Sequence, residues 1–303
     1  MMTRVLCIGE VMVELSGIRA DGAARVGFGG DTANTAIYLS RILGVGRVGY
    51  LTRLGEEPFG AQIADALIAE GVDLPPTIMC AGRQTGLYAI TLDDTGERSF
   101  TYWRTNAPVR DLLDNQAELD WAEGFDALYI SGITLAVLRP AGITSLLALM
   151  AGYRNAGKLV MLDTNLRPSL WRANHPDVDP GDIYRRAASC ADIVKTGADE
   201  VQEIFGANGA SELACPELVI TDGPGPVYLH VNGAVQTVRV DPAPQVVDAT
   251  AAGDSFNAAY LGARLQGAEP PKAVMEGHAL ARKVIAHHGA IIPKPALPAG
   301  DEE

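Results

Sequence analysis

The sequence predicts an α/β fold: a mostly parallel central sheet with helices on both faces, plus a small antiparallel β flap. Short apolar runs recur along the 303 residues, and Ala/Leu-rich stretches of helical length separate several of them. Such alternation is typical of a parallel sheet whose strands are buried on both faces. A stretch of alternating apolar and polar residues near 85–104 breaks this rhythm and indicates the flap.

Each expected element follows from its own run of residues. The expected strands are RVLCIGEVMVEL, YAITL, ALYISGI, LVMLDTN, DIVKTG, ELVITDG and VYLHV. The expected helices span 32–43, 60–70, 141–156 and 182–189. Flap segments are expected near 10–30 and 85–104, the second as a hairpin that turns at DDTGE, and flaps of this kind close over ligands. We expect the whole chain, 1–303, to form one domain.

The composition excludes several classes of function. The formal net charge of −13 argues against non-specific nucleic-acid binding, which needs Lys and Arg against the phosphates. The four cysteines are scattered, without a CxxC pair or a Cys/His cluster, so we expect reduced thiols in the cytoplasm and no structural zinc site. No uninterrupted apolar stretch reaches about 18 residues, so we expect no membrane span.

The segment VVDATAAGDSFNAAYLGARLQG, residues 246–267, joins a strand-like stub to a helix through very small residues. If a helix starts near Gly253, its first N–H groups have no intrahelical acceptor and form an anion site. Asp254 then lies in the first turn, either as an acid that favours the helix dipole or as a general base beside the anion site. The second arrangement is what phosphoryl transfer requires, although the segment lacks a Walker motif.

A second segment of small residues, RVGFGGDTANTAIYLSRIL, places Gly29 and Gly30 before an expected helix. Asp31 or Thr32 can cap that helix, and Asn34 falls in its first turn. Glycines at a helix entry let a ligand approach closely, and an Asn side chain can both donate hydrogen bonds to it and accept them. A plain turn with a cap explains the same residues.

These two motifs, in this order, resemble the PfkB (ribokinase-like) carbohydrate kinase family. The similarity covers essentially the whole chain and is most specific at 29–34 and 248–256. IGEVMVEL, TGERSFTYWR, LYISGITLAVL, LDTNLRPSLW and HGAIIP are similar to the bacterial branch that phosphorylates 2-dehydro-3-deoxy-D-gluconate to its 6-phosphate with ATP. The resemblance therefore implies a ribokinase-like fold and a sugar kinase whose ligands are a nucleotide and a small sugar acid.

The resemblance also implies roles for individual residues. Asp254 corresponds to the general base, which takes the proton of the sugar's terminal hydroxyl, and Ala251, Ala252 and Gly253 correspond to the anion hole. The expected substrate contacts are Gly30, Asp31, Asn34, Tyr88, Tyr102, Arg104, Arg167 and Asp254. The expected nucleotide contacts are Thr196, Thr221, Gly223, Gly225, Ala252, Gly253 and His278.

Two arginines give a chemical reason to expect an acidic substrate. Arg104 in TYWR and Arg167 in NLRPSLW lie beside Trp or Pro, in settings suited to an ordered guanidinium. Arg binds a carboxylate in a bidentate way, which a neutral sugar does not need. Each could instead form a surface ion pair, and Arg167 could face the transferring phosphate. Glu14 falls where relatives keep a sugar-binding acid, or else it packs the flap hinge.

On the nucleotide side, the sequence departs from the family pattern. Asp222 and Pro224 stand within the turn that relatives place near the phosphates. His278 falls where relatives often carry Asn, and it can equally be an ordinary histidine on a helix face. Relatives usually have Thr in place of Ala249 and many have Gly in place of Ala251, a position where Ala narrows the backbone angles but keeps its N–H group.

The metal motif is also altered. The family's Asn-x-x-Glu sequence is replaced by Thr196 and Asp199, with Glu200 next, so Asp199 is expected to reach Mg²⁺ through water. The resemblance implies ATP and Mg²⁺, because the metal neutralises nucleotide phosphates during transfer, and it leaves a monovalent cation open.

Several alternatives stay open from sequence. A kinase of the same family could act on fructose, ribose or 2-dehydro-3-deoxygalactonate, and a non-catalytic ligand sensor could share the fold. A Rossmann NAD-binding protein is excluded, because no G-x-G-x-x-G follows the first strand. Exposed edges of the flap predict a homo-oligomer, a dimer or larger, that forms through the lid.

Overall fold

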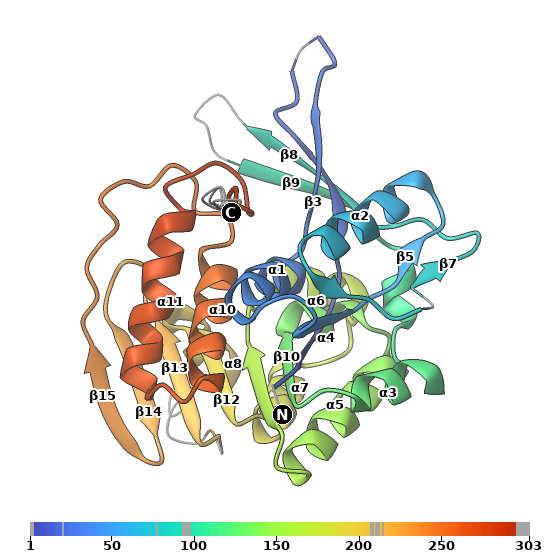
Figure 1. The fold of residues 1–303 in the computed structure, drawn as a ribbon. Coiled ribbons are helices and arrows are strands. Elements are labelled where there is room, and N and C mark those ends of the chain that lie inside the picture. Colours follow the sequence, from blue (N-terminus) through green and yellow to red (C-terminus); the bar gives the residue numbers. More distant parts are fainter. Residues whose placement is uncertain are drawn as a thin grey trace, which may run out of the picture.

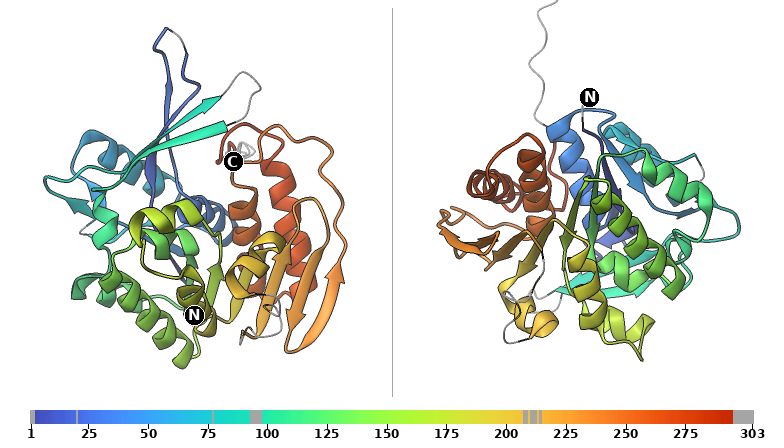
Figure 2. Two further views of the ribbon diagram at one scale, coloured as in Figure 1. Left: turned by 180° about the vertical axis from the view of Figure 1, so that it is seen from behind. Right: turned by 90° about the horizontal axis from the view of Figure 1, so that it is seen from below.

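The computed structural model describes residues 3–19, 21–76, 78–92, 98–206, 209, 213 and 215–294. Its body is a nine-stranded sheet covered by helices, and a four-stranded lid stands off that body (Figures 1 and 2). In spatial order the large sheet consists of β15 (Ala234–Val238), β14 (Val227–Val231), β13 (Glu217–Thr221), β12 (Ile193–Gly197), β11 (Leu159–Asp163), β10 (Ala127–Ser131), β1 (Val5–Ile8), β4 (Val48–Leu51) and β6 (Val72–Asp73). Strands β13 to β6 are parallel, whereas β14 and β15 are antiparallel additions at one edge.

Helices cover both faces of this sheet, which is why β1 is buried along its whole length. Val5 and Cys7 pack into one core, while Leu6 and Ile8 pack into the other, as the two-residue period of a strand requires. The first core is closed by α1 (Asp31–Leu43), α2 (Pro58–Ala69), α10 (Ala252–Leu265) and α11 (Pro270–Val284). The second is closed by η1 (Pro108–Asp111), α3 (Gln116–Glu123), α4 (Gly132–Val137), α5 (Pro140–Asn155), α6 (Pro168–Asn174), α7 (Pro180–Ser189) and α8 (Ala198–Phe205).

The lid is a separate sheet with the order β3 (Arg25–Gly29), β2 (Met12–Ser16), β8 (Leu87–Leu92) and β9 (Arg98–Trp103). The pairs β2–β3 and β8–β9 are antiparallel, and a parallel pairing of β2 with β8 joins them. A short two-stranded sheet pairs β5 (Leu54–Gly55) with β7 (Met79–Cys80). The lid strands rise from the body in Figure 1 and in the opposite view of Figure 2 (left). The lid therefore has edges that the body does not cover.

The structure confirms the predicted fold class. The predicted helices correspond to α1, α2, α5 and α7, and the predicted apolar runs overlap β1, β2, β8 and β10 to β14. Strands β4 to β7 were not predicted, because apolar runs of two to four residues show no readable period. The predicted turn at 93–97 lies outside the described residues.

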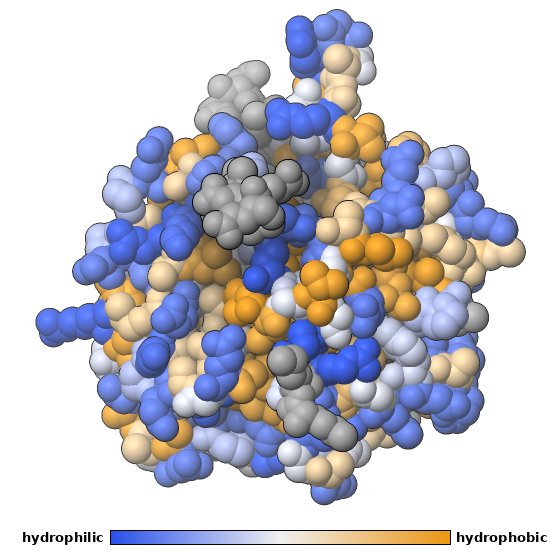
Figure 3. Space-filling model, in the orientation of Figure 1, coloured by the Kyte–Doolittle hydropathy of each residue, from blue (hydrophilic) through white to orange (hydrophobic). Residues whose placement is uncertain are grey.

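Across the described part of the chain, no helix is both long enough and apolar enough to cross a membrane. The face of the molecule in Figure 3 is largely hydrophilic, with smaller hydrophobic areas between the polar side chains.

Candidate active site

Asp254 lies in the first turn of α10, and the backbone just before this helix has an unusual conformation. Ala251 adopts φ 60° and ψ 18°, in the left-handed region, and no side chain caps the helix. The N–H of Ala252 donates to the carbonyl of Ala249 at 3.2 Å. Within the described residues, no protein acceptor faces the N–H groups of Gly253 and Asp254. These two groups, at the positive end of the helix dipole, are therefore available to an anion, whereas the Ala252 N–H, which was predicted to take part, is already engaged.

The carboxylate of Asp254 is held by the neighbouring helix α1. Asn34 Nδ2 donates to Asp254 Oδ2 at 2.8 Å, and Thr35 Oγ1 donates to the Asp254 carbonyl at 3.2 Å. Burial raises the pKa of Asp254 well above its ordinary value, and the nearby charge of Asp31 raises it further, whereas the Asn34 hydrogen bond and Lys195 lower it. A carboxyl with a raised pKa that still ionises is suited to act as a general base.

The entry to α1 shows why glycine is needed before this helix. A Cβ added to Gly30 would lie 2.1 Å from the carbonyl oxygen of Glu10, a backbone atom that cannot move aside. Asp31, the first residue of the helix, accepts from the N–H of Thr32 at 2.8 Å and from Asn165 Nδ2 at 2.9 Å. The Gly30–Asn34 segment therefore approaches both α10 and the end of β11, which brings the two predicted motifs together.

A second buried carboxylate lies beside the first. Asp163, at the end of β11, accepts from Asn257 Nδ2 at 2.8 Å and pairs with Lys195 Nζ at 3.2 Å. Burial lowers the pKa of Lys195, but the carboxylates of Asp163, Glu200 and Asp254 raise it, and their combined effect holds it above its ordinary value. The ammonium group therefore stays charged.

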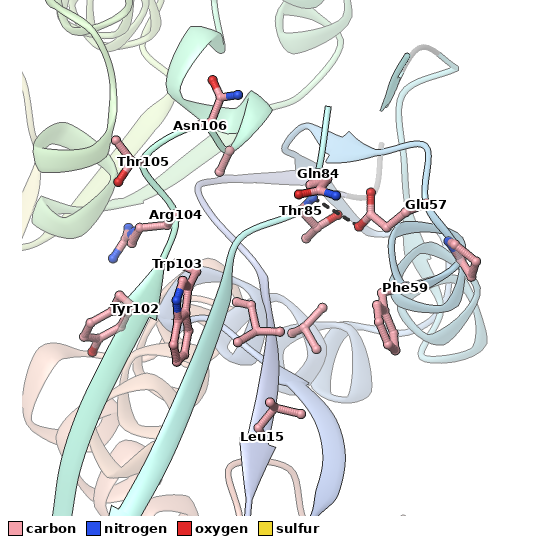
Figure 4. A pocket seen from close by; sticks show the side chains of 14 residues that line it. Leu15, Glu57, Phe59, Gln84, Thr85, Tyr102, Trp103, Arg104, Thr105 and Asn106 are labelled. Carbon is pink, nitrogen blue, oxygen red and sulfur yellow. Dashed lines mark hydrogen bonds between the residues drawn. The ribbon is translucent and has the colours of Figure 1, made fainter. Parts of the chain in front are cut away.

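The lid contributes aromatic and charged side chains. Tyr88 donates to Glu14 Oε2 at 2.5 Å, and burial raises the pKa of Tyr88. Figure 4 shows Tyr102 and Arg104 pointing to the same side of β9. Arg104 forms an ion pair with Glu10, and both side chains are largely buried. Burial raises the pKa of Glu10, while Arg104 lowers it.

A cavity of about 830 Å³ lies against the lid (Figure 4). Tyr102, Trp103 and Arg104 line it together with Phe59 and Leu15. Neither Asp254 nor Asn34 lines this cavity. The cavity thus lies beside the lid and is separate from Asp254 and Asn34.

The model of the pfkB family of carbohydrate kinases matches residues 2–297, which is nearly the whole chain. The chain belongs to this family. Its relatives include the 2-dehydro-3-deoxygluconokinase of Escherichia coli K12, which is 36% identical and aligns with 99% of this chain and 100% of its own length. The 2-dehydro-3-deoxygluconokinase of Dickeya dadantii is also 36% identical, over 97% of this chain and 98% of its own.

Solved structures of sugar kinases share the fold. A fructokinase of Xylella fastidiosa with bound ATP has a TM-score of 0.83 at 22% identity, over 96% of this chain and 94% of that one. A fructokinase double mutant of Vibrio cholerae, with fructose, ADP and potassium ion bound, has a TM-score of 0.80 at 25% identity, over 95% and 94% of the two chains. The likeness agrees with the predicted ribokinase-like architecture.

For this carbohydrate kinase, the structure joins two of the predicted segments directly, because Asn34 binds Asp254 while Asp31 binds Asn165. Tyr88 binds Glu14 instead, within the lid. Arg167 lies just before α6 and is exposed, and its Nη1 donates to the Leu166 carbonyl at 3.0 Å. Within the described residues, no carboxylate lies at ion-pair distance from Arg167, so its charge is available to an anion.

Four of the predicted nucleotide residues, Thr196, Thr221, Gly223 and Gly225, lie in or just after β12 and β13, whereas Ala252 and Gly253 begin α10 and His278 lies in α11. Thr196 is fully buried, and its hydroxyl shares a hydrogen bond with Thr164 Oγ1 at 2.9 Å, while its carbonyl accepts from Thr221 Oγ1 at 3.4 Å. Gly223, at φ 50°, follows β13 in the turn that also contains Gly225. One ring nitrogen of His278 lies 2.6 Å from the Asp241 carbonyl, so this side chain already has a partner within the protein.

At the start of α8 the two candidate acids differ. Asp199 is exposed, whereas Glu200 is half-buried and faces the loop after β11. Glu200 accepts from the Leu166 N–H at 2.8 Å, from the Gly197 N–H at 3.3 Å, and from the Thr164 hydroxyl. Glu200 therefore orders the loop that carries Asn165 and Arg167. No cluster of three His, Cys, Asp or Glu residues suited to a metal occurs among the described residues.

Sequence reasoning missed four polar side chains at or near the carboxyl ends of parallel strands and one on a helix: Glu10, Asp163, Asn165 and Lys195, and Asn257 of α10. One signal was available for Lys195, because DIVKTG places a lysine inside an otherwise apolar strand. The other four could not be identified as site residues without knowing which strand ends and helices are neighbours in the fold.

Proposed function

We propose that this chain transfers the γ-phosphoryl group of ATP to the terminal hydroxyl of 2-dehydro-3-deoxy-D-gluconate, forming the 6-phosphate. The observation that carries the proposal is the pairing of Asp254, held by Asn34 at 2.8 Å, with two free N–H groups at the start of α10. A base and an anion site at one point are the two parts that phosphoryl transfer needs. The relatives named 2-dehydro-3-deoxygluconokinase support the choice of substrate.

In this mechanism, Asp254 takes the proton of the attacking hydroxyl while the N–H groups of Gly253 and Asp254 hold the transferring phosphoryl. Asn34 keeps the carboxylate pointing at the hydroxyl, because its amide binds the other carboxylate oxygen. Gly30 and Asp31 line the sugar side, and Tyr88 and Tyr102 cover it from the lid. Arg104 or Arg167 binds the carboxylate of the sugar acid.

Mg²⁺ would be held mainly by nucleotide phosphates and water, as is usual for this ion, and would neutralise phosphate charge. Asp199, which is exposed at the start of α8, remains our candidate for contact through water. Thr221, Gly223, Gly225 and His278 remain candidates for the nucleotide. A monovalent cation is proposed by analogy with the potassium-bound fructokinase of Vibrio cholerae.

A coupled ADP-release assay tests the proposed substrate. We expect kcat/KM for 2-dehydro-3-deoxy-D-gluconate to exceed that for fructose, ribose and 2-dehydro-3-deoxy-D-galactonate. Faster turnover of a neutral sugar would overturn the proposed substrate while leaving the kinase assignment intact. Repeating the assay with sodium in place of potassium, and with EDTA, measures the contribution of each cation.

We also propose that the protein is a homo-oligomer formed through the lid and that it works in the cytoplasm. The edge strands β3 and β9 and the exposed Phe100, Tyr102 and Trp103 support the first point. The four free cysteines support a reducing compartment. Light scattering after size-exclusion chromatography tests the oligomer, and a monomer at micromolar concentration would contradict it.

A further inference from the structure

We infer that Lys195 is a further catalytic residue, whose ammonium group contacts the phosphoryl group during transfer, beside the N–H groups of Gly253 and Asp254. This inference rests on the proposed kinase function but not on the identity of the sugar. It deepens the account of the phosphate end of the site, where a backbone anion site alone had been predicted.

The position of the ammonium group is the first argument. Lys195 lies near the carboxyl end of β12, and its side chain is only 13% exposed. Its Nζ lies 3.7 Å from the point where a Cβ on Gly253 would stand. The lysine therefore reaches across from β12 to the first turn of α10, at the place where the free N–H groups emerge.

The balance of charge is the second argument. A cation beside the positive end of a helix is unfavourable, because the helix dipole and the ammonium repel each other. The carboxylates of Asp163, which pairs with Nζ at 3.2 Å, and of Glu200 and Asp254 offset the charge of the ammonium. Within the described residues they leave the N–H groups of Gly253 and Asp254 without an acceptor. An anion between Lys195 and the N–H groups of α10 would satisfy both positive groups at once. A transferring phosphoryl, which carries negative charge on three oxygens, is such an anion.

The step itself is balanced without further reagents. The sugar oxygen forms a bond to the γ-phosphorus as the bond from that phosphorus to the ADP oxygen breaks. The hydroxyl proton passes to Asp254, and the bonding electrons leave with ADP. Lys195 keeps its proton throughout and stabilises the non-bridging oxygens, in the same way as the two N–H groups.

The test compares Lys195→Met with Lys195→Arg, which keeps the charge, and with Lys158→Met. Lys158 lies outside the site, where its ammonium donates to the Glu123 carbonyl, so its loss controls for removing one charge. We expect Lys195→Met to lower kcat on the order of 10²-fold. Titration calorimetry with ATP and ADP, without sugar, should show ATP affinity falling about tenfold more than ADP affinity. Lys195→Arg should retain most of the ATP affinity, and Lys158→Met should match the wild type.

A purely structural role for Lys195 predicts different results. Lys195→Met leaves the buried Asp163 carboxylate unpaired, which alone can disturb the site. The double variant Lys195→Met/Asp163→Asn removes that unpaired charge while keeping an acceptor for Asn257. If Lys195 contacts the phosphoryl, the double variant stays slow and stays weak for ATP. Recovery of wild-type kcat and ATP affinity in the double variant would overturn the inference.

The activity of the wild-type protein on different sugars distinguishes a failure of this inference from a failure of the proposed function. A wild type that phosphorylates some other sugar overturns the proposed substrate, and the Lys195 variants are then compared on that sugar. A wild type that phosphorylates no sugar overturns the proposed function. The ATP and ADP affinities then decide on Lys195 alone, and equal affinity losses for both nucleotides would contradict a contact to the γ-phosphate.

Discussion

The reacting centre and the lid are built in opposite ways. At the centre, Asp254, Asp163 and Lys195 are each held by a hydrogen bond or ion pair from a different element of the fold. On the lid, Phe100 and Trp103 are 48% and 58% exposed. The centre is thus preorganised for charge, whereas the lid offers contact surface that becomes covered only when something binds it.

The two regions meet through buried polar contacts. Arg104 of the lid pairs with Glu10 of the body, and Tyr88 binds Glu14 within the lid. In this arrangement Glu10 occupies the guanidinium that a substrate carboxylate would use. We therefore expect the lid to govern substrate choice and the centre to govern the rate of phosphoryl transfer, and the following experiments separate these roles.

The largest effect is expected at the centre. Asp254→Asn removes the base while keeping an acceptor for Asn34, so kcat should fall by about 10³-fold or more, with little change in the melting temperature. The coupled assay measures the rate, and Asp177→Asn, an exposed acid outside the site, is the matched control. A rate within tenfold of the wild type would exclude Asp254 as the base. If the wild-type protein transfers no phosphoryl group in this assay, the result would favour the alternative that the protein is a non-catalytic ligand sensor.

The lid should respond to substrate charge. Arg104→Ala should lower kcat/KM for the sugar acid by about 10²-fold, because a charged hydrogen-bonded pair is lost, and should affect fructose much less. Arg104→Lys keeps the charge beside Glu10 and loses the bidentate geometry, so it separates binding from folding. The exposed lid residue Arg25 provides the control variant Arg25→Ala. Equal losses on both sugars would show that Arg104 serves lid structure only.

The pH dependence should shift in opposite directions for two neighbours of Asp254. The base works when ionised, and its pKa is raised, so kcat/KM should fall as the pH drops through that raised value. Asp31→Asn removes a negative charge that raises this pKa, and the acidic limb should move to lower pH. Asn34→Ala removes a hydrogen bond that lowers it, and the limb should move to higher pH. If the acidic limbs of both variants move in the same direction, the pH profile reports a group other than Asp254.

The smallest effect concerns stability. Ala251 adopts a left-handed conformation at φ 60°, which is unfavourable for a residue with a Cβ. Ala251→Gly should raise the free energy of unfolding by up to about 1 kcal/mol, after the greater flexibility of glycine in the unfolded chain is subtracted. Ala252→Gly, one residue later and already helical, should lower it by a similar amount. Denaturant unfolding measures both, and a less stable Ala251→Gly would mean that the left-handed conformation is not strained.

Much of the fold was predictable because it depends on local patterns. The apolar runs of β1 and β10 to β13 indicate strands that are buried on both faces of a sheet. The small residues before Asp254 indicate the start of a helix with free N–H groups. The Gly29–Asn34 segment was likewise recognisable as a helix entry, and its predicted ligand role stays a prediction. The contact that excludes a Cβ at Gly30 is with the Glu10 backbone, which only the tertiary structure reveals.

Other features were decided by contacts between distant parts of the chain. Whether Asp199 or Glu200 turns inward depends on how α8 packs on the loop after β11, and the structure turns Glu200 inward. The pairing of Arg104 with Glu10 joins residues 94 positions apart in sequence, and Asn34 meets Asp254 across 220. A sequence pattern records which residues prefer burial or a helix end, because those preferences act over a few residues. It does not record which strand ends become neighbours, and the charges of this site act on one another only through that arrangement.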